Sequence, residues 1–594
     1  MRAWQFGIVG LALLFGAISH WVIFEYDLFW QVRFGRELLA GAPVQSIDRW
    51  SHTAFGTPYR NIQWLSTIFM ALVAKLAPGY IAFGYLRSLF IAGWIYLLGR
   101  LSRAGRWPLF VAILLVPWIY LASWFRLQMR PDLFAACIFA ALLLLLLSNA
   151  SDARKRLGGL ALLLLSANVH TGTVVFGILL YSSYALTANS SWRNRLVYAG
   201  LGFLCWFATP NGITILQIVR DNALTYDWSR THNPDLQPFS TSLLELSQGG
   251  WALRLWVAYC GLALISLFQP KARLPALYQN RLFVLGVAGL LTLESLHHIR
   301  AIHYQMVFLL PAVATFIGSL TSRIQLAAPL AAACFLWGGL LPEQIHTSAH
   351  PIGDGVSNLD LPVESAAFIA AVRPTGKLHN AYPFGGYLID VLPDYPVSID
   401  GRELPFAAFR DEMSSAIGTG RYAEFLREHH IDIVLETLPG PLRDLQQGMI
   451  DGHEPLYPRQ EWATVFFDNI SIVYLRRTDA NSRIIAQHEY QAIHRGISPN
   501  QIQRGAEAFY DREYERCLNE VADSIYCRMG KATILARQGQ GDSALALLNE
   551  ARRIDPKSLE VLVSLLQAAQ GRNDQAAIEE LVQTLDRVGH RMAP

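Results

Sequence analysis

Residues 4–24, WQFGIVGLALLFGAISHWVIF, form an apolar run of the length that a helix needs to cross a lipid bilayer, about 20 residues. The run starts close behind Arg2, as the apolar part of a signal peptide would. No small-residue cleavage site follows it, because the chain continues as EYDLFW. We therefore expect a retained membrane-spanning helix, and this expectation sets the fold class of the chain around it.

Apolar runs separated by short polar loops continue to about residue 342. The chain of 594 residues is 52% hydrophobic and only 16% charged, with a mean hydropathy of +0.26, whereas globular domains usually carry about a quarter charged residues. A polytopic helical membrane protein is therefore predicted. Its roughly eleven spans fall near residues 4–24, 81–99, 107–124, 132–149, 158–169, 172–187, 196–209, 251–268, 282–296, 304–320 and 325–341.

The basic loops of this pattern fall on alternate connections and predict a cytoplasmic N-terminus. This holds only if residues 64–79, WLSTIFMALVAKLAPG, lie along the membrane surface as a juxtamembrane helix instead of crossing it. The long C-terminal region then lies outside the cytoplasm. The sequence predicts an integral protein, placed in a bacterial inner membrane, with periplasmic C-terminal domains.

Four regions follow from the change in composition near Pro342. Residues 1–342 form the membrane domain, and its first outer loop covers 25–80. Residues 343–480 alternate strand-like runs (HNAY, PVSID and DIVLE) with helical ones (GGYLIDVL and RYAEFLREHH), which predicts an α/β domain. Within it, residues 462–477 predict a hairpin that turns at Asp468-Asn469. Residues 481–498 are a linker.

Residues 499–594 are helical and resemble tetratricopeptide repeats, with small residues and a terminal proline at the spacing of a 34-residue repeat. Roughly three helix pairs are expected, and such repeats commonly bind a protein partner. Cys517 and Cys527 fall here, outside the cytoplasm in the predicted topology, so a disulfide between consecutive helices is expected. The chain has no CxxC or Cys/His metal spacing. A net charge of +3 without a basic stripe excludes nucleic-acid binding.

The predicted outer loops carry most of the ionisable residues outside the C-terminal third, whereas the inner loops hold little beyond Lys and Arg. Several ionisable groups on one face of a membrane domain indicate a site, although longer loops also collect polar residues by chance. The candidate catalytic residues are Asp27 and Glu25. The candidate substrate-binding residues are Arg126, Arg130, Asp132, His170, Asn211, His232, His298, Arg300, Asp400 and Arg402.

Glu25 and Asp27 are two residues apart at the end of the first apolar run. Such a pair suits a general base, or it binds a divalent cation such as Mg²⁺ or Mn²⁺ with Asp27 as ligand. Arg126, Arg130 and Arg300 suit a lipid phosphate, since guanidinium forks match phosphate oxygens, or they pair with Asp132 or Glu294. Asp400 and Arg402 either bind a ligand or form a tight turn with an ion pair.

These features resemble the GT-C glycosyltransferases, which have many spans, an acidic motif and juxtamembrane helices in the first outer loop, and often a soluble C-terminal domain. The matching acidic motif is Glu25-Tyr26-Asp27. The chain is also similar to a family of bacterial multi-span membrane proteins, through FEYDLFWQVRFGRELLAG, NIQWLS, SANVHTG, TPNG, HHIRAIHY and NAYPFGGYLIDVLPDYPVSIDGR, over about residues 20–410. The family's acidic motif usually carries Asp where this chain has Glu25.

The resemblance implies inverting transfer of a sugar from a polyprenyl-phosphate carrier to an extracytoplasmic glycan or protein acceptor. Asp27 would be the base or a metal ligand, and Arg300 and Arg130 would hold the phosphate. Two alternatives belong to other classes of protein. One is a non-catalytic membrane scaffold of a cell-envelope assembly that binds partners through its repeats. The other is a transporter of lipid-linked glycans.

Overall fold

The computed structural model describes residues 2–104, 108–188, 190–224, 250–320, 323–341, 352–402, 406–438, 456–493 and 505–589. The chain folds into two compact units. The first unit contains the chain up to Ser46 and the segment Pro58–Gly355. The second contains Ile47–Thr57 and Val356–Ala593, so an eleven-residue stretch from the predicted first loop belongs to the C-terminal unit.

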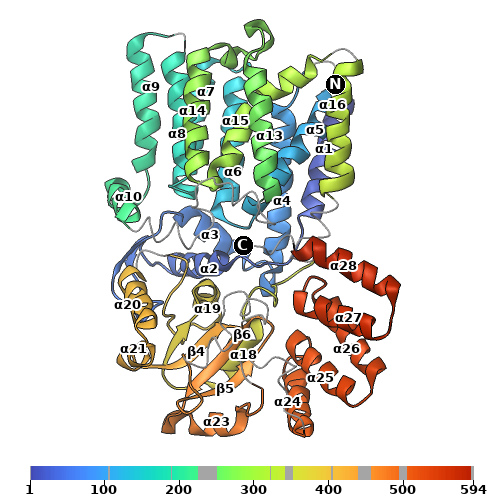
Figure 1. Cartoon of the computed structure of the whole chain (residues 1–594). Helices are drawn as coiled ribbons and strands as arrows, with labels where there is room; N and C mark the ends of the chain where they lie inside the picture. The colour runs from blue at the N-terminus through green and yellow to red at the C-terminus, as the bar shows by residue number, and fades with distance from the viewer. Residues whose placement is uncertain are drawn as a thin grey trace. The chain divides into compact units, whose positions relative to one another are not determined.

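The first unit is a helix bundle, shown in Figure 1. Its helices are α1 (Arg2–Ile18), α2 (Tyr26–Leu39), α3 (Trp64–Val73), α4 (Ile81–Leu101), α5 (Pro108–Ala122), α6 (Pro131–Leu147), α7 (Asp152–Val169), α8 (Val174–Thr187), α9 (Trp192–Leu204), α10 (Ile215–Leu224), α13 (Gly250–Leu267), α14 (Arg281–His297), α15 (Ile302–Gly318) and α16 (Arg323–Phe335). Two short strands, β1 (Gln45–Ile47) and β2 (Pro58–Arg60), pair with each other between α2 and α3.

Apolar side chains of facing helices form the core of this bundle. Ile8 and Phe15 of α1, Trp94 of α4 and Leu115 of α5 are fully buried together. Burial of each large apolar side chain contributes about 1.5–3 kcal/mol. The bundle therefore depends on contacts between helices far apart in the sequence.

Few of these helices satisfy the length and hydropathy that a membrane span requires. Among the described residues, two helical stretches do so, Pro78–Leu101 and Ile299–Gly318. A third is added if Trp192–Phe207 and Gly212–Asp221, which are bent by 83°, count as one span. The predictions of about eleven spans, of a GT-C-like multi-span membrane domain and of an integral inner-membrane protein with periplasmic domains are therefore wrong.

The physical reason is helix length. The run predicted at 107–124 is α5, a helix of 15 residues, and the run predicted at 132–149 is α6, a helix of 17 residues. A hydropathy window also averages over residues beyond the helix ends, so it reports apolar composition instead of helix length. Apolar residues lie both in the bundle core and on its surface, where Leu89, Leu264 and Leu285 are exposed.

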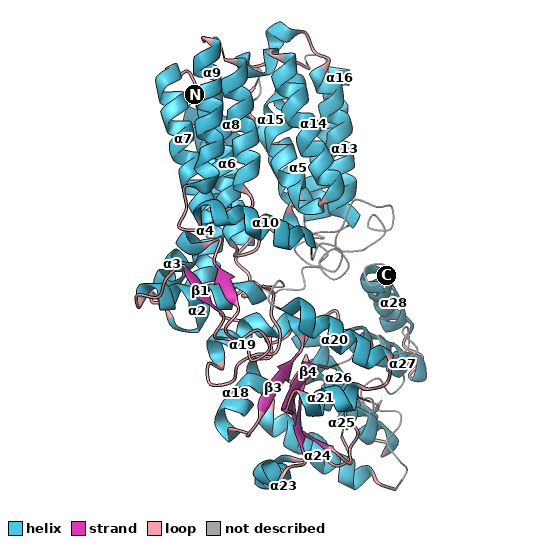
Figure 2. Ribbon diagram, turned by 90° about the vertical axis from the view of Figure 1, so that its left-hand side faces the viewer, coloured by secondary structure: helices cyan, strands magenta, loops and turns pink. Residues whose placement is uncertain are grey.

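Helices α2 and α3 lie at one end of the bundle, across the direction of its long helices, as Figures 1 and 2 show. They pack closely at Gly35, where a Cβ atom would come within 1.9 Å of the Thr67 carbonyl oxygen. Only glycine allows this approach without moving a backbone. The predicted juxtamembrane helix at 64–79 is the ten-residue α3, and its partner is α2.

The second unit contains a four-stranded sheet in the order β3-β4-β6-β5. β3 (Lys377–Asn380) and β4 (Ile431–Thr437) are parallel, whereas β6 (Ser471–Arg476) is antiparallel to both β4 and β5 (Trp462–Phe467). The predicted hairpin at Asp468-Asn469 is confirmed. The helices that accompany the sheet are α18 (Val363–Val372), α19 (Gly385–Val391), α20 (Ala407–Gly418), α21 (Tyr422–Glu428) and α23 (Ser482–His488).

The stretch PVSID at 396–400, predicted as a strand, is not one. Pro396 has no N–H to donate, and Val397 forms only an isolated parallel bridge, with Ser51. The backbone N–H of Val397 donates to the Trp50 carbonyl at 2.9 Å. The segment therefore pairs through its backbone with residues 47–57, and its bonds to β3 run through side chains, as from Ser398 N to Asn380 Oδ1 at 2.9 Å.

The helical C-terminal region consists of α24 (Glu507–Glu520), α25 (Ile525–Arg537), α26 (Gly541–Ile554), α27 (Leu559–Gly571) and α28 (Gln575–Gly589), each packed against the next. The predicted disulfide between Cys517 and Cys527 is present. Glu513 accepts hydrogen bonds from three consecutive backbone N–H groups, those of residues 491–493, at 2.7–2.8 Å. Helix α24 is therefore attached to the segment that follows the sheet.

Candidate active site

Asp27 lies in the first turn of α2, where unpaired backbone N–H groups favour a negative charge. Its Oδ1 accepts a hydrogen bond from Trp30 Nε1 at 3.2 Å, and its Oδ2 lies 3.7 Å from a terminal nitrogen of Arg130. The side chains of Asp27 and Arg130 are 28% and 26% exposed. A carboxylate and a guanidinium therefore lie side by side where solvent reaches both.

Glu25, two residues earlier, is buried. Its Oε1 accepts hydrogen bonds from Arg87 at 2.9 Å and from the backbone N–H of Met129 at 2.7 Å, and its Oε2 accepts from Phe24 N at 3.1 Å. Burial opposes ionisation, but the Arg87 charge and the backbone donors outweigh it and hold the pKa of Glu25 below its ordinary value. Glu25 is therefore an enclosed carboxylate that does not reach solvent.

A second enclosed ion pair joins Arg126 to Asp132, whose side chains are 9% and 8% exposed. Arg126 Nε donates to Asp132 Oδ2 at 3.2 Å, and the hydroxyl of Tyr304 donates to Oδ1 at 3.2 Å. Of the two roles predicted for Arg126, phosphate binding or an ion pair with Asp132, the structure supports the ion pair.

His170 caps the C-terminus of α7 and is half-buried. Its Nδ1 lies 3.3 Å from the backbone nitrogen of Thr173, and the neutral ring accepts a hydrogen bond at only one of its two nitrogens. Nε2 lies 3.2 Å from the amide of Gln63, which is bonded in turn to Gln31 at 3.0 Å. A chain of polar side chains therefore runs from α2 through the start of α3 to the end of α7.

The charge of His170 is controlled by its surroundings. Burial lowers the pKa of His170 to about 4, opposed by the nearby Asp132 carboxylate and reinforced by the cations Arg300 and Arg126. The ring is therefore neutral at physiological pH.

Three of the short motifs noted in the sequence meet beside α3, at residues 61–66, 166–172 and 209–212. The bonds that join them are Ser66 Oγ to Val169 O at 2.8 Å, Trp64 Nε1 to Asn168 Oδ1 at 2.9 Å and Asn211 Nδ2 to Asn61 O at 2.8 Å. Asn211 is 2% exposed and holds a backbone carbonyl. These hydrogen bonds hold together the segments that carry His170 and Gln63.

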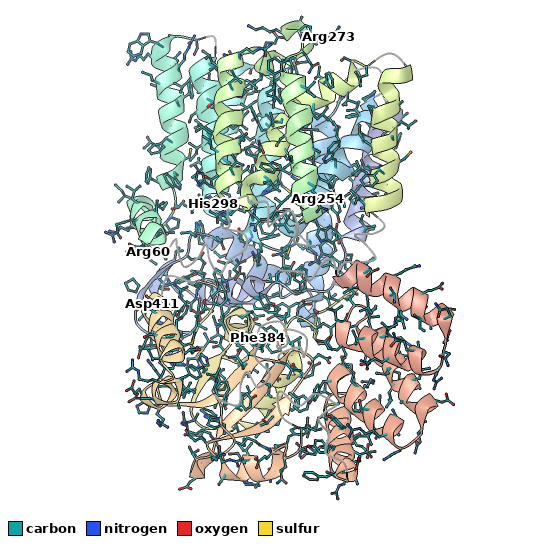
Figure 3. All side chains as sticks on the ribbon, viewed as in Figure 1. Arg60, Arg254, Arg273, His298, Phe384 and Asp411 are labelled. Carbon is teal, nitrogen blue, oxygen red and sulfur yellow. A yellow bond between two sulfur atoms is a disulfide. The ribbon has the colours of Figure 1, made fainter. Side chains whose placement is uncertain are left out.

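Of the remaining predicted residues of the first unit, His298 Nδ1 lies 2.7 Å from Glu294 Oε1, one helical turn earlier. Arg300 is exposed on the short 3₁₀ helix Ile299–Ala301. Figure 3 labels His298 at the end of the bundle opposite Arg273 of the basic 269–281 loop. His232 lies outside the described residues.

Asp400 and Arg402 belong to the second unit and are bonded to each other. Arg402 Nε donates to Asp400 Oδ1 at 2.8 Å, and its NH1 donates to Asp48 Oδ1 at 2.7 Å. The guanidinium also lies 4.8 Å from the ring centroid of Trp50. With Arg402 2% exposed and both carboxylates fully buried, the structure supports the tight turn with an ion pair over the ligand-binding alternative.

The described residues contain no group of three or more His, Cys, Asp or Glu side chains placed to hold a metal ion. The predicted metal ligand Asp27 has the Arg130 guanidinium beside it, and a second positive charge there would be repelled. The surroundings of Asp27 therefore do not fit a Mg²⁺ or Mn²⁺ ion.

Gln31, Gln63, Arg87 and Tyr304 belong to this site but were not predicted. No short sequence motif distinguishes a Gln or Tyr of a functional site from a Gln or Tyr elsewhere in the chain. Arg87 did leave a signal, because a lone cation inside an apolar run needs a buried partner.

No model of a known protein family matches the chain, and no curated protein matches it. The predicted membership of the GT-C glycosyltransferases thus lacks support from the comparisons, as the predicted multi-span architecture does from the structure. The geometry at Asp27 and Arg130 is the remaining basis for a functional proposal.

Proposed function

We propose that the first unit transfers a glycosyl group from a polyprenyl-phosphate-linked donor to an acceptor hydroxyl, with Asp27 as the base and Arg130 as the cation that binds the phosphate. The observation that carries the proposal is the partly exposed Asp27–Arg130 pair, which lies beside two buried ion pairs. A base has to reach the proton that it removes, and a phosphate ligand has to reach its anion. Glu25, Arg126 and Asp132 are too enclosed to do either.

The contact between Asp27 and Arg130 also suits a site that opens to admit substrate. An exposed ion pair contributes about 0–1 kcal/mol, so separating the two side chains costs little. Arg130 can then turn toward a phosphate while Asp27 stays in the first turn of α2. Arg300 is a further exposed cation of the first unit, on the 3₁₀ helix Ile299–Ala301.

In the proposed reaction the acceptor oxygen attacks the anomeric carbon while the Asp27 carboxylate takes the hydroxyl proton. The bond from that carbon to the phosphate oxygen breaks, and its electron pair leaves with polyprenyl phosphate. Arg130 balances the charge that develops on this oxygen. A single displacement inverts the anomeric centre.

The test uses the full-length protein with a lipid extract of the cells that make it as donor source, and the glycans and proteins of those cells as acceptors. Release of polyprenyl phosphate is followed by mass spectrometry, with and without EDTA. Loss of a general base costs about 10²- to 10⁴-fold, so Asp27→Asn should reduce release by that factor. EDTA should have no effect.

The matched control is Glu37→Gln, on the same helix. Glu37 is paired with Arg33 at 3.1 Å and is 30% exposed, so it resembles Asp27 in burial and pairing. This variant should release polyprenyl phosphate at the wild-type rate. Equal activity of wild type and Asp27→Asn would reject the proposal. Absence of release from folded wild type would favour the non-catalytic scaffold.

A further inference from the structure

Arg87 of α4 is a fully buried cation at the junction of several segments. Its NH1 donates to Glu25 Oε1 at 2.9 Å and its Nε donates to the Ser19 carbonyl at 3.3 Å. Its NH2 donates to the Trp21 carbonyl, and the guanidinium lies 4.6 Å from the Trp21 ring centroid. Arg87 therefore holds the chain that leaves α1 and the residue that precedes α2.

The partner of Arg87 extends this junction to a further segment. The Glu25 oxygen that accepts from Arg87 also accepts from the backbone N–H of Met129 at 2.7 Å. Met129 directly precedes Arg130, and Glu25 is two residues before Asp27. Glu25 Oε1 is thus bonded to the residue that directly precedes Arg130, and Glu25 itself lies two residues before Asp27.

We propose that Arg87 and Glu25 are positioning residues that set the separation between Asp27 and Arg130. This inference rests on the proposed function, and neither residue touches the substrate. Arg87 fixes the Glu25 carboxylate, and the carboxylate fixes the backbone on each side of the site. A displacement of about 1 Å at reacting groups can cost on the order of 10²-fold in rate, so this spacing matters.

Stability alone does not account for the pair. A buried ion pair can often be replaced by apolar residues of similar size without loss of stability, because burying charges is costly. Apolar side chains would not accept the Met129 N–H group. The pair supplies a directed hydrogen bond at the residue before Arg130, which is what positioning requires.

The first experiment uses the double variant Glu25→Met/Arg87→Met, which removes both charges and the acceptor for the Met129 N–H group and leaves no unpaired ion in the core. It should fold, with turnover reduced about 10- to 100-fold and the KM for the donor changed less than threefold. Arg87→Lys keeps the charge with fewer donors and should recover part of the turnover. Arg100→Met, at the exposed end of the same helix, is the control and should behave as wild type.

A second readout does not depend on activity. Hydrogen exchange of the peptide that contains Met129 and Arg130 should accelerate in the double variant and in Arg87→Lys, but not in Arg100→Met. Unchanged exchange, or wild-type turnover in a folded double variant, would overturn the positioning role. If exchange accelerates as expected but Asp27→Asn turns over like wild type, the proposed function fails and the hydrogen-bonded junction stands.

Discussion

The two units each contain a cluster of Asp and Arg with opposite arrangements. In the first unit, Asp27 and Arg130 are 3.7 Å apart and about a quarter exposed. In the second, Arg402 lies between Asp48 and Asp400 at 2.7–2.8 Å, stacked near Trp50, and is 2% exposed. Both clusters consist of Asp and Arg, and they differ in how deeply these side chains are buried and in what packs against them.

This difference distinguishes a structural cluster from a candidate catalytic one. Three buried charges that bond to one another have no contact with solvent, and removing one leaves the others uncompensated. An exposed pair can exchange its partner for a substrate at little cost. Sequence motifs dense in Asp and Arg therefore do not by themselves indicate a ligand site.

The Arg402 cluster, formed by Asp48, Asp400 and Arg402, has a structural role. Asp48 and Trp50 lie in the segment Ile47–Thr57, which belongs to the second unit although its neighbours in sequence belong to the first. His52 of this segment lies 2.9 Å from the Leu378 carbonyl through its Nε2. Arg402 therefore anchors this segment to the C-terminal unit.

The largest effect is expected from Arg402→Met, which leaves two buried carboxylates without a counter-charge. Breaking a buried ion pair costs about 3–5 kcal/mol, so the second unit should unfold at a much lower urea concentration. Arg427→Met is the control, since Arg427 is 55% exposed and its contact with Glu461 is 3.5 Å long. Proteolysis of the second unit across a urea series measures both. Equal midpoints for the two variants would contradict the comparison.

An effect of intermediate size is expected at Glu364, which forms no ion pair with the residues that the structure describes. Burial, reinforced by the charge of Asp468, raises the pKa of Glu364 to about 7. The folded state then binds its proton more tightly than the unfolded state does. The stability is thus full below about pH 4.5 and falls as the pH rises toward 7.

The variant Glu364→Gln should remove this pH dependence. Because Glu364 is only partly buried, the gain above pH 7 is expected to be on the order of 1 kcal/mol. Urea unfolding of wild type and variant at pH 5 and pH 8 measures it. A wild-type protein as stable at pH 8 as at pH 5 would show that this carboxylate is not held protonated.

The smallest effect is expected at the proposed catalytic pair. A double-mutant cycle with Asp27→Asn and Arg130→Met should give a coupling energy for unfolding of about 0–1 kcal/mol, because solvent reaches both side chains and their contact is 3.7 Å long. The corresponding cycle with Asp48→Asn and Arg402→Met should give more. A coupling above about 2 kcal/mol at Asp27 and Arg130 would mark the pair as structural and weaken its proposed role.

Short stretches of sequence predicted much of the secondary structure correctly. The turn residues Asp468 and Asn469 between two β-rich runs gave the hairpin, and helical periodicity gave α19 and α21. Cys517 and Cys527, ten residues apart at the ends of consecutive helices, gave the disulfide. Each of these depends on residues that are neighbours in the chain, so a linear pattern records it.

The predicted number of membrane spans, by contrast, was wrong. Apolar composition was evident, but where each helix starts and stops depends on caps, prolines and packing that an average does not resolve. The strand predicted at PVSID was also wrong, since the partners of its backbone N–H and C=O groups include residues 50–53, which are far away in the sequence.

The sequence by itself determined that Asp27, Glu25, Arg126, Arg130 and Asp132 are candidate site residues. Charged groups beside apolar runs cost free energy when they are buried, so each requires a partner or a function. Tertiary structure alone decided their roles. Glu25 meets Arg87 across 62 residues, and Asp48 meets Arg402 across 354. Burial and hydrogen-bond saturation arise from such long-range contacts, and these properties separate an enclosed ion pair from a side chain that can meet a substrate.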